Sequence, residues 1–200
     1  MSLMQTIQSL IDAKAIAMNT AIPGEVVSYD SGSGKAEVRP LVRQKFSDGT
    51  ILTPPVITNV PIIMPRTQAA SLTLPVAEGD PVLIVFSQWS IDRWASEGGL
   101  VDAGDARDHS MSDAVAFPGA FSFKDGPTGE TGTVLKDGNT KVKLNGEKVA
   151  IGNGTAELLQ QIVDALDAIA TSTCANGAPL SKAAAITAAK AKIESIKGSI

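Results

Sequence analysis

The sequence contains few of the residues on which catalytic, metal and disulfide chemistry usually depends. Its 200 residues include one histidine, His109, one cysteine, Cys174, two tryptophans, one tyrosine and five phenylalanines. A single cysteine excludes an intramolecular disulfide framework and is typical of a chain that folds in a reducing compartment. No Cys-x-x-Cys, His-x-His, Gly-x-Ser-x-Gly or Walker pattern occurs. We therefore expect no catalytic residue, no metal site, no cofactor and no enzymatic activity.

Charge and hydropathy argue against two further classes of protein. Lysine and arginine number 17 against 21 acidic residues, which gives a net charge of −4 and a pI of about 5.0. Proteins that bind the nucleic-acid backbone generally present a concentrated basic face, so no nucleic-acid partner is expected. No apolar run approaches the roughly 18 residues of a membrane-spanning helix. The first residues lack the basic segment of a secretory signal, which predicts a protein that is soluble as made.

Glycine-containing turns are the most regular feature that the chain does have. Between Gly126 and Thr155, the dipeptides Asp137-Gly138, Asn145-Gly146 and Asn153-Gly154 recur every eight residues. Such dipeptides are typical of the two central positions of a type I′ hairpin turn, where both residues have positive φ. The segment therefore predicts an antiparallel meander with lysines on one face. The other face would be apolar and would comprise Leu135, Val142, Leu144, Val149 and Ile151.

A ribbon with so few apolar residues is marginally stable by itself in water. Identical ribbons can bury their apolar faces together around a rotation axis and leave the lysines in solvent. We therefore predict an intertwined trimeric β-prism or β-helix, with the five apolar residues at the trimer interface. The alternative is a β-extension that folds back on its own domain.

The end of the chain predicts two short helices joined by a turn. Thr155 and Ser181 are candidate N-caps, and Asn176-Gly177 with Pro179 separates the helices. Apolar residues follow at spacings of three, four and three in each helix, and helices this short need packing to be stable. Three such hairpins on one axis would make a six-helix bundle. The predicted interface therefore extends to Leu159, Ile162, Leu166, Ile169, Ile186, Ile193 and Ile196.

The beginning of the chain predicts an amphipathic helix over residues 2–19, which Pro23-Gly24 ends. Its apolar residues include Leu3, Ile7, Leu10 and Ile11. They can dock either on their own domain or on a neighbouring protein, and the sequence does not separate the two.

The segment between the helix and the glycine-rich turns is rich in strand signals. Candidate strands cover residues 25–29, 35–46, 56–64, 72–76 and 81–88. Five strands without an intervening helix predict a small closed barrel, for which the OB-fold is the economical candidate. We expect Trp89 and Trp94 to close one end of the barrel. The alternative function of such a barrel is binding of single-stranded nucleic acid or carbohydrate, which the scarcity of aromatic residues disfavours.

The order of these parts resembles a known family. Residues 74–86 resemble a strand pair around a Glu-Gly-Asp turn. Residues 107–119 resemble the segment that leaves a barrel. Both features are similar to those of the central spike proteins of contractile phage tails. Members of that family have an OB-fold near the N-terminus, followed by a trimeric β-helix. The resemblance covers roughly residues 1–155 and transfers no catalytic residue.

The resemblance implies a homotrimeric structural virion protein, made in the host cytoplasm, that forms the central spike or spike-hub of a tail baseplate. Implied partners are two further copies, the tail tube or hub, the baseplate wedge proteins and, transiently, the host envelope. Leu3, Ile7, Leu10 and Ile11 are the candidates for the tube or hub contact. Many such spikes end in a His-x-His pair that binds iron, and this sequence has none. Either the helical hairpin is the distal end or a separate tip protein binds there.

Taken together, the sequence predicts a mainly β chain with terminal helices. The expected domains are an N-terminal helix (1–20), an OB-fold domain (21–123), a glycine-rich trimeric β-helix segment (124–154) and a C-terminal helical hairpin (155–200).

Overall fold

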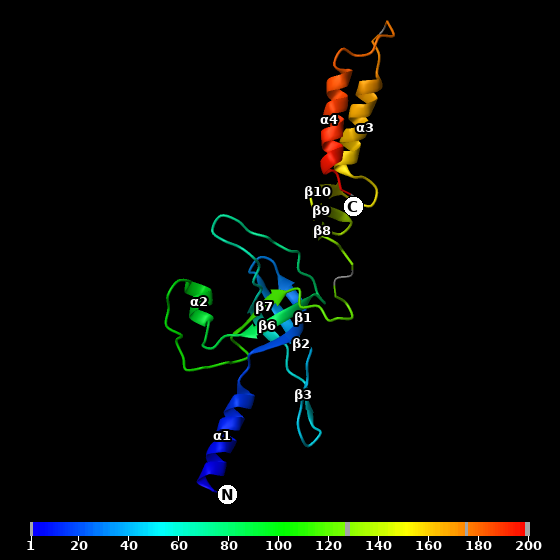
Figure 1. The fold of residues 1–200 in the computed structure, drawn as a ribbon. Coiled ribbons are helices and arrows are strands. Elements are labelled where there is room, and N and C mark those ends of the chain that lie inside the picture. The colour runs from blue at the N-terminus through cyan, green and yellow to red at the C-terminus, as the bar shows by residue number, and fades with distance from the viewer. Residues whose placement is uncertain (1, 127–128, 175, 199–200) are drawn as a thin grey trace. The chain divides into compact units, whose positions relative to one another are not determined.

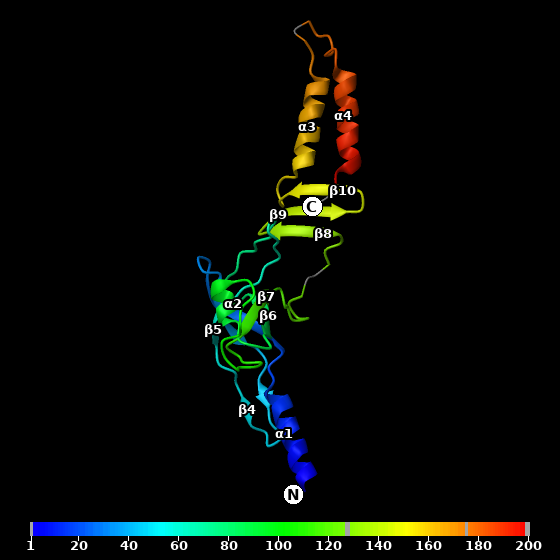
Figure 2. The same ribbon diagram turned by 90° about the vertical axis from the view of Figure 1, so that its left-hand side faces the viewer.

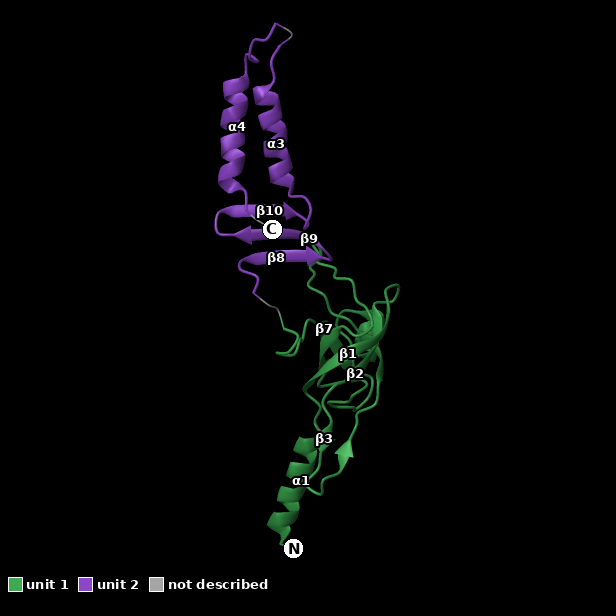
Figure 3. Ribbon diagram, turned by 90° about the vertical axis from the view of Figure 1, so that its right-hand side faces the viewer, with its two compact units in different colours: residues 1–126 green, residues 127–200 purple. Residues whose placement is uncertain are grey.

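The computed structural model describes residues 2–126, 129–174 and 176–198. They form two compact units, Met1–Gly126 and Pro127–Ile200 (Figures 1 and 3). The first unit contains α1 (Leu3–Ala17), β1 (Ala21–Asp30), β2 (Lys35–Pro40), β3 (Gln44–Lys45), β4 (Ile51–Leu52), β5 (Ile57–Pro61), β6 (Pro81–Phe86), α2 (Asp92–Glu97) and β7 (Ala114–Pro118). The second contains β8 (Thr133–Asp137), β9 (Thr140–Asn145), β10 (Lys148–Gly152), α3 (Leu158–Thr171) and α4 (Ala183–Ile196).

A five-stranded antiparallel sheet with the order β5-β2-β1-β6-β7 forms the body of the first unit. The sheet curls into a half-barrel, and its two edge strands meet where Ile62 forms a parallel bridge with Ala116. Apolar residues alternate along each strand, so that Val38, Val82 and Ile84 point inward and are fully buried. The predicted mainly β architecture with terminal helices is confirmed. Its assignment to the OB-fold stays a prediction, which this strand order supports.

The set of strands differs from the predicted set at two places. Residues 72–76 form no strand, because Pro75 has no N–H to donate to a ladder and the Leu74 N–H points to the sulfur of Met64. The fifth strand is instead β7, which lies within the segment predicted as the barrel exit. Residues 35–46 do not form one strand either, because β2 ends at Pro40. The chain then continues into a two-stranded excursion, residues 41–56, which we call the β-arm and which contains β3 and β4.

The second unit begins with the predicted meander, in the order β10-β9-β8 (Figure 2). Its two turns sit one position later than predicted, because their central residues are Gly138-Asn139 and Gly146-Glu147. Only the glycine has positive φ in each turn, 55° and 62°, as in a type II′ turn. The pairing register therefore shifts by two residues. Because side chains alternate with a period of two, each residue keeps its predicted face.

The C-terminal helices α3 and α4 pack against each other as the predicted hairpin (Figure 2). Their caps differ from the predicted ones. The Asn153 side chain accepts hydrogen bonds from the backbone N–H groups of Thr155 and Ala156, which holds Thr155 in a turn before the helix. Glu157 is the N-cap of α3, and Lys182 rather than Ser181 precedes α4. No helix in the described ranges is long and apolar enough to cross a membrane.

Candidate interaction surfaces

The predicted apolar face of the meander exists in the single chain and is largely uncovered. Leu135 pairs directly with Val142, Leu144 with Val149, and Val142 with Ile151, so all five residues share one side of the sheet. Leu135 and Leu144 are 55% and 50% exposed, and the other three are half-buried. Assembly of this face into a trimeric β-helix stays a prediction.

The opposite face of the same sheet carries lysines. Lys141 Nζ lies 2.7 Å from Glu130 Oε1, and Lys143 Nζ lies 3.6 Å from Glu130 Oε2. The hydrogen bond from Lys141 and the charges of both lysines lower the pKa of Glu130 below its ordinary value. Ala150 is fully buried on this side, whereas its alternating neighbours on the apolar side are not. The two faces therefore differ clearly in chemistry, as the sequence predicts.

The seven residues predicted as the helical trimer interface are only partly covered by the hairpin. Ile162, Ile169 and Ile196 are exposed in the single chain. Leu159, Leu166, Ile186 and Ile193 are half-buried. The most buried residue of the hairpin is Val163, at 3%, which the predicted stripe did not include. Lys190 Nζ joins the two helices through Asp167 Oδ1 at 2.9 Å. The role of the seven predicted apolar residues in a trimer stays a prediction.

Helix α1 exposes the apolar residues predicted for docking. Leu3, Ile7, Leu10 and Ile11 are all exposed, from 44% at Ile7 to 78% at Leu3. A capping box begins the helix, since the Ser2 hydroxyl accepts from the Gln5 N–H and the Gln5 side chain accepts from the Ser2 N–H. No neighbouring segment within the described residues buries this stripe.

The loop before β7 anchors the C-terminal end of α1 to the half-barrel. Lys14 Nζ forms an ion pair with Asp108 at 2.8 Å. The Asn19 side-chain amide donates to the His109 carbonyl at 2.8 Å, and His109 Nδ1 lies 3.1 Å from the Asn19 carbonyl. His109 is half-buried and has positive φ, 48°. The single histidine therefore joins the segment after α1 to the loop before β7.

The β-arm is an apolar surface that the sequence analysis did not identify. Its exposed apolar residues are Leu41, Val42, Phe46, Ile51, Leu52 and Val56. The signal was present in the sequence, because the predicted strand over residues 35–46 was longer than one face of a small barrel requires. The Asp48-Gly49 pair at the tip provided the turn.

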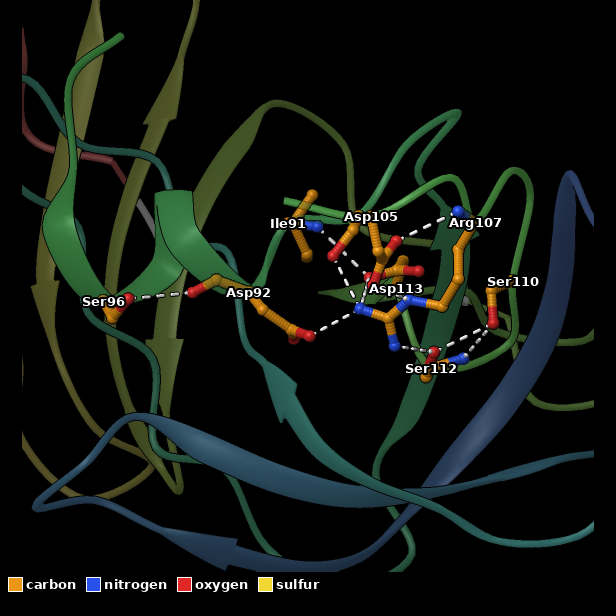
Figure 4. Close-up of polar contacts among 9 residues, drawn as sticks. Ile91, Asp92, Ser96, Asp105, Arg107, Ser110, Ser112 and Asp113 are labelled. Atoms are coloured by element: carbon orange, nitrogen blue, oxygen red, sulfur yellow. Dashed lines mark hydrogen bonds and ion pairs between the residues drawn. The ribbon is translucent and has the colours of Figure 1, made fainter. Parts of the chain in front are cut away.

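Arg107 organises the long loop that connects β6 to β7 (Figure 4). Its guanidinium donates to Asp92 Oδ2 at 2.5 Å and to the hydroxyl groups of Ser90 and Ser112. Arg107 Nε lies 2.8 Å from Asp105 Oδ2 in a contact that is not aligned as a hydrogen bond. The hydrogen bond to Asp92 raises the pKa of Arg107, so the side chain is fully charged.

Asp113 is the buried carboxylate of this network (Figure 4), with an exposed fraction of 1%. Its Oδ1 accepts from the Ile91 N–H at 3.1 Å and lies 3.6 Å from Arg107. All the groups in this network come from one loop and the start of β7. The arrangement is therefore a structural clamp, and no group of three or more potential metal ligands occurs in the described ranges.

The expectation that Trp89 and Trp94 close a barrel end is wrong. Trp89 is 61% exposed and Trp94 is 49% exposed. Trp89 forms an isolated antiparallel β-bridge with Asp108 in the loop, and Trp94 lies on the short helix α2. Phe86 belongs to the buried core, and Met111 packs against it.

A polar groove of about 510 Å³ lies beside the loop over residues 64–73. Its lining includes Tyr29, Arg66, Gln68 and Ser71. Tyr29 is the one aromatic residue of this lining. The groove therefore lacks the series of aromatic platforms on which single-stranded nucleic acids stack.

Comparison with protein families gives one match. Residues 22–119 match the family described as Phage protein Gp138 N-terminal domain. The matched segment coincides closely with the five-stranded half-barrel, which runs from Ala21 in β1 to Pro118 in β7. A search of curated proteins found no match to the chain. The match supports a phage structural protein and thus a virion component.

Proposed function

We propose that this chain is the homotrimeric central spike or spike-hub of a contractile tail baseplate. In this role it links the tail tube to the tip that penetrates the host envelope. It is a structural protein that needs no cofactor and catalyses no reaction. Its further partners are the tube or hub and the wedge proteins of the baseplate, with a separate tip protein as a candidate partner of the C-terminal hairpin.

The observation that supports this proposal most directly is the uncovered apolar face of β8, β9 and β10. Full burial of a leucine, isoleucine or valine side chain contributes about 1.5–3 kcal/mol. Three copies that turn this face toward a common axis gain part of that contribution from each of Leu135, Val142, Leu144, Val149 and Ile151, which are about half exposed or half-buried in the single chain, while the lysine face stays in water. The match of residues 22–119 to a phage protein family also supports the proposal.

Light scattering behind a sizing column tests the proposal. We expect a molar mass of three times the 20.6 kDa of one chain, unchanged on dilution. Val142→Asp should dissociate the trimer, because a charge on the shared axis would be buried without a partner. Lys148→Asp changes charge on the opposite face of the same sheet and serves as the matched control, in which the trimer should persist.

A stable monomer in the native protein would contradict the proposal. It would favour the alternative, a ligand-binding barrel, and would direct attention to the polar groove beside Tyr29. A trimer that tolerates Val142→Asp but not Lys148→Asp would show that the inward face is the lysine face.

A further inference from the structure

Two apolar surfaces of the first unit lie at the same end of the half-barrel without a partner. One is the stripe on α1 formed by Leu3, Ile7, Leu10 and Ile11. The other is a groove at the base of the β-arm. Figures 1 and 3 show α1 and the β-arm leaving the half-barrel on the same side.

The volume and the apolar lining of the groove suit the binding of a helix. It has a volume of about 310 Å³, at the lower end of the roughly 300–1,000 Å³ of ligand pockets. Val42 and Leu52 line it from the β-arm, and Ile22, Phe86 and Met111 line it from the half-barrel. Apolar grooves of this kind accept the anchors of an amphipathic helix at i, i+4, i+7 and i+8. Leu3, Ile7, Leu10 and Ile11 have that spacing.

The lengths of the two surfaces agree. Helix α1 has 15 residues, which corresponds to about 22 Å at 1.5 Å per residue. One side of the β-arm, residues 41–47, spans about 23 Å at 3.3 Å per residue. A helix laid along the arm would therefore match it in length and would cover the face that carries Leu52, whereas the neighbouring Ile51 points to the opposite face.

The helix does not occupy the groove of its own chain. Its last turn is tied to the loop before β7 by the Lys14–Asp108 ion pair, and Met18 and Asn19 form part of the rim of the groove. From that rim the helix projects outward, with its apolar residues exposed.

We propose that α1 of each copy lies in the β-arm groove of the next copy, head to tail around the trimer axis. The inference rests on the proposed trimer, since such a head-to-tail contact closes into a ring only when the rotation returns to the first copy. It assigns α1 a partner within the trimer, in place of the tube or hub contact that the family resemblance implied.

A coiled coil of three α1 helices explains the structure less well. The positions that follow Leu3, Ile7 and Leu10 in a heptad pattern are Lys14 and Ala17, and Lys14 pairs with Asp108. A stable coiled coil needs about three to four heptads, more than 15 residues provide. That arrangement would also leave the apolar groove of the β-arm uncovered.

Cysteine cross-linking of the full chain tests the inference. In a Cys174→Ser background, Ile7→Cys and Leu52→Cys are combined and treated with a short bismaleimide. We expect covalent dimers and trimers, with the Ile7 and Leu52 peptides joined between chains. Ser9→Cys lies on the opposite side of α1 and replaces Ile7→Cys in the matched control, in which the covalent products should be lost.

Three results would overturn the inference. They are a cross-link within one chain, covalent dimers from Ile7→Cys alone, and no product from the Ile7–Leu52 pair. Light scattering on the same samples separates this failure from that of the proposed function. A trimer without cross-linked products overturns the helix exchange alone, whereas a monomer overturns both.

Discussion

At the scale of single residues, the buried carboxylate of Asp113 has the most specific environment in the first unit. We expect Asp113→Ala to lower the free energy of unfolding by about 1–3 kcal/mol, because the Ile91 N–H loses its acceptor and Arg107 loses a charge partner. Denaturant unfolding measures the change. Asp105→Ala removes an exposed partner of the same arginine and should cost less than about 1 kcal/mol. Equal losses in the two variants would show that the burial of Asp113 has no energetic role.

Sequence reasoning is weakest for residues whose environment depends on a long loop. Trp89 and Trp94 were expected in a barrel end because large aromatic side chains are usually well buried. The 27 residues between β6 and β7 instead fold around Arg107, and no local sequence pattern predicts that clamp.

At the scale of elements, the cap of α3 predicts a pH dependence of the helical hairpin. Burial raises the pKa of Glu157, but hydrogen bonds from the N–H groups of Gln160 and Ile151 outweigh it, so the pKa is lowered from 4.5. A lowered folded-state pKa means that the stabilisation is complete above the unfolded value and is lost as the pH falls through the folded value. The hairpin should therefore lose stability on acidification below about pH 4.5.

Helicity followed by circular dichroism during thermal unfolding, at pH values from neutral to below 4, measures this effect. In Glu157→Gln the side chain no longer ionises, so the variant should be less stable than the native protein at neutral pH and the two should converge in acid. Stability curves that stay parallel at all pH values would contradict a role for the Glu157 carboxylate.

Some elements of this fold are predicted by neighbouring residues in the sequence, and others depend on pairing between distant segments. Turn residues and apolar spacing predict the meander and the two helices. Each turn of the meander lies one position later than predicted, but the pairing register moves by two residues, so each side chain keeps its predicted face of the sheet. Thr155 does not cap α3, because the Asn153 side chain holds it in a turn and the Glu157 side chain accepts from the Gln160 N–H at the start of the helix. The missing strand over residues 72–76 and the separate β-arm depend on long-range pairing, which residue propensity does not specify.

At the scale of the whole molecule, the sequence predicted the class of protein better than its surfaces. The half-barrel, whose residues 22–119 match a phage protein family, is built from segments that pair within one chain. In the proposed trimer, other copies of the chain cover the apolar face of the meander, α1 and the β-arm. A single sequence therefore identifies these surfaces only through their excess of apolar residues. The β-arm was overlooked because its residues also fit an ordinary barrel strand.

The two units have separate cores, and this predicts how the assembled protein unfolds. The first core is centred on Val38, Val82 and Ile84, and the second contains Ala150 and Val163. Scanning calorimetry should therefore resolve two transitions rather than one, since independent cores do not unfold as one cooperative unit. The transition of residues 127–200 should rise more steeply with protein concentration, because assembly through the apolar face stabilises that unit by mass action.

Val142→Asp connects this behaviour to the proposed axis. The substitution should lower the midpoint of the second-unit transition and remove most of its concentration dependence. The half-barrel transition should fall less, since Val142 lies outside that core and the half-barrel loses only the contact between α1 and the groove of the next copy. Lys148→Asp, on the lysine face, should leave both transitions near their native positions. A single transition that moves as a whole in Val142→Asp would mean that the two units unfold as one, and the stability of the half-barrel would then depend directly on assembly.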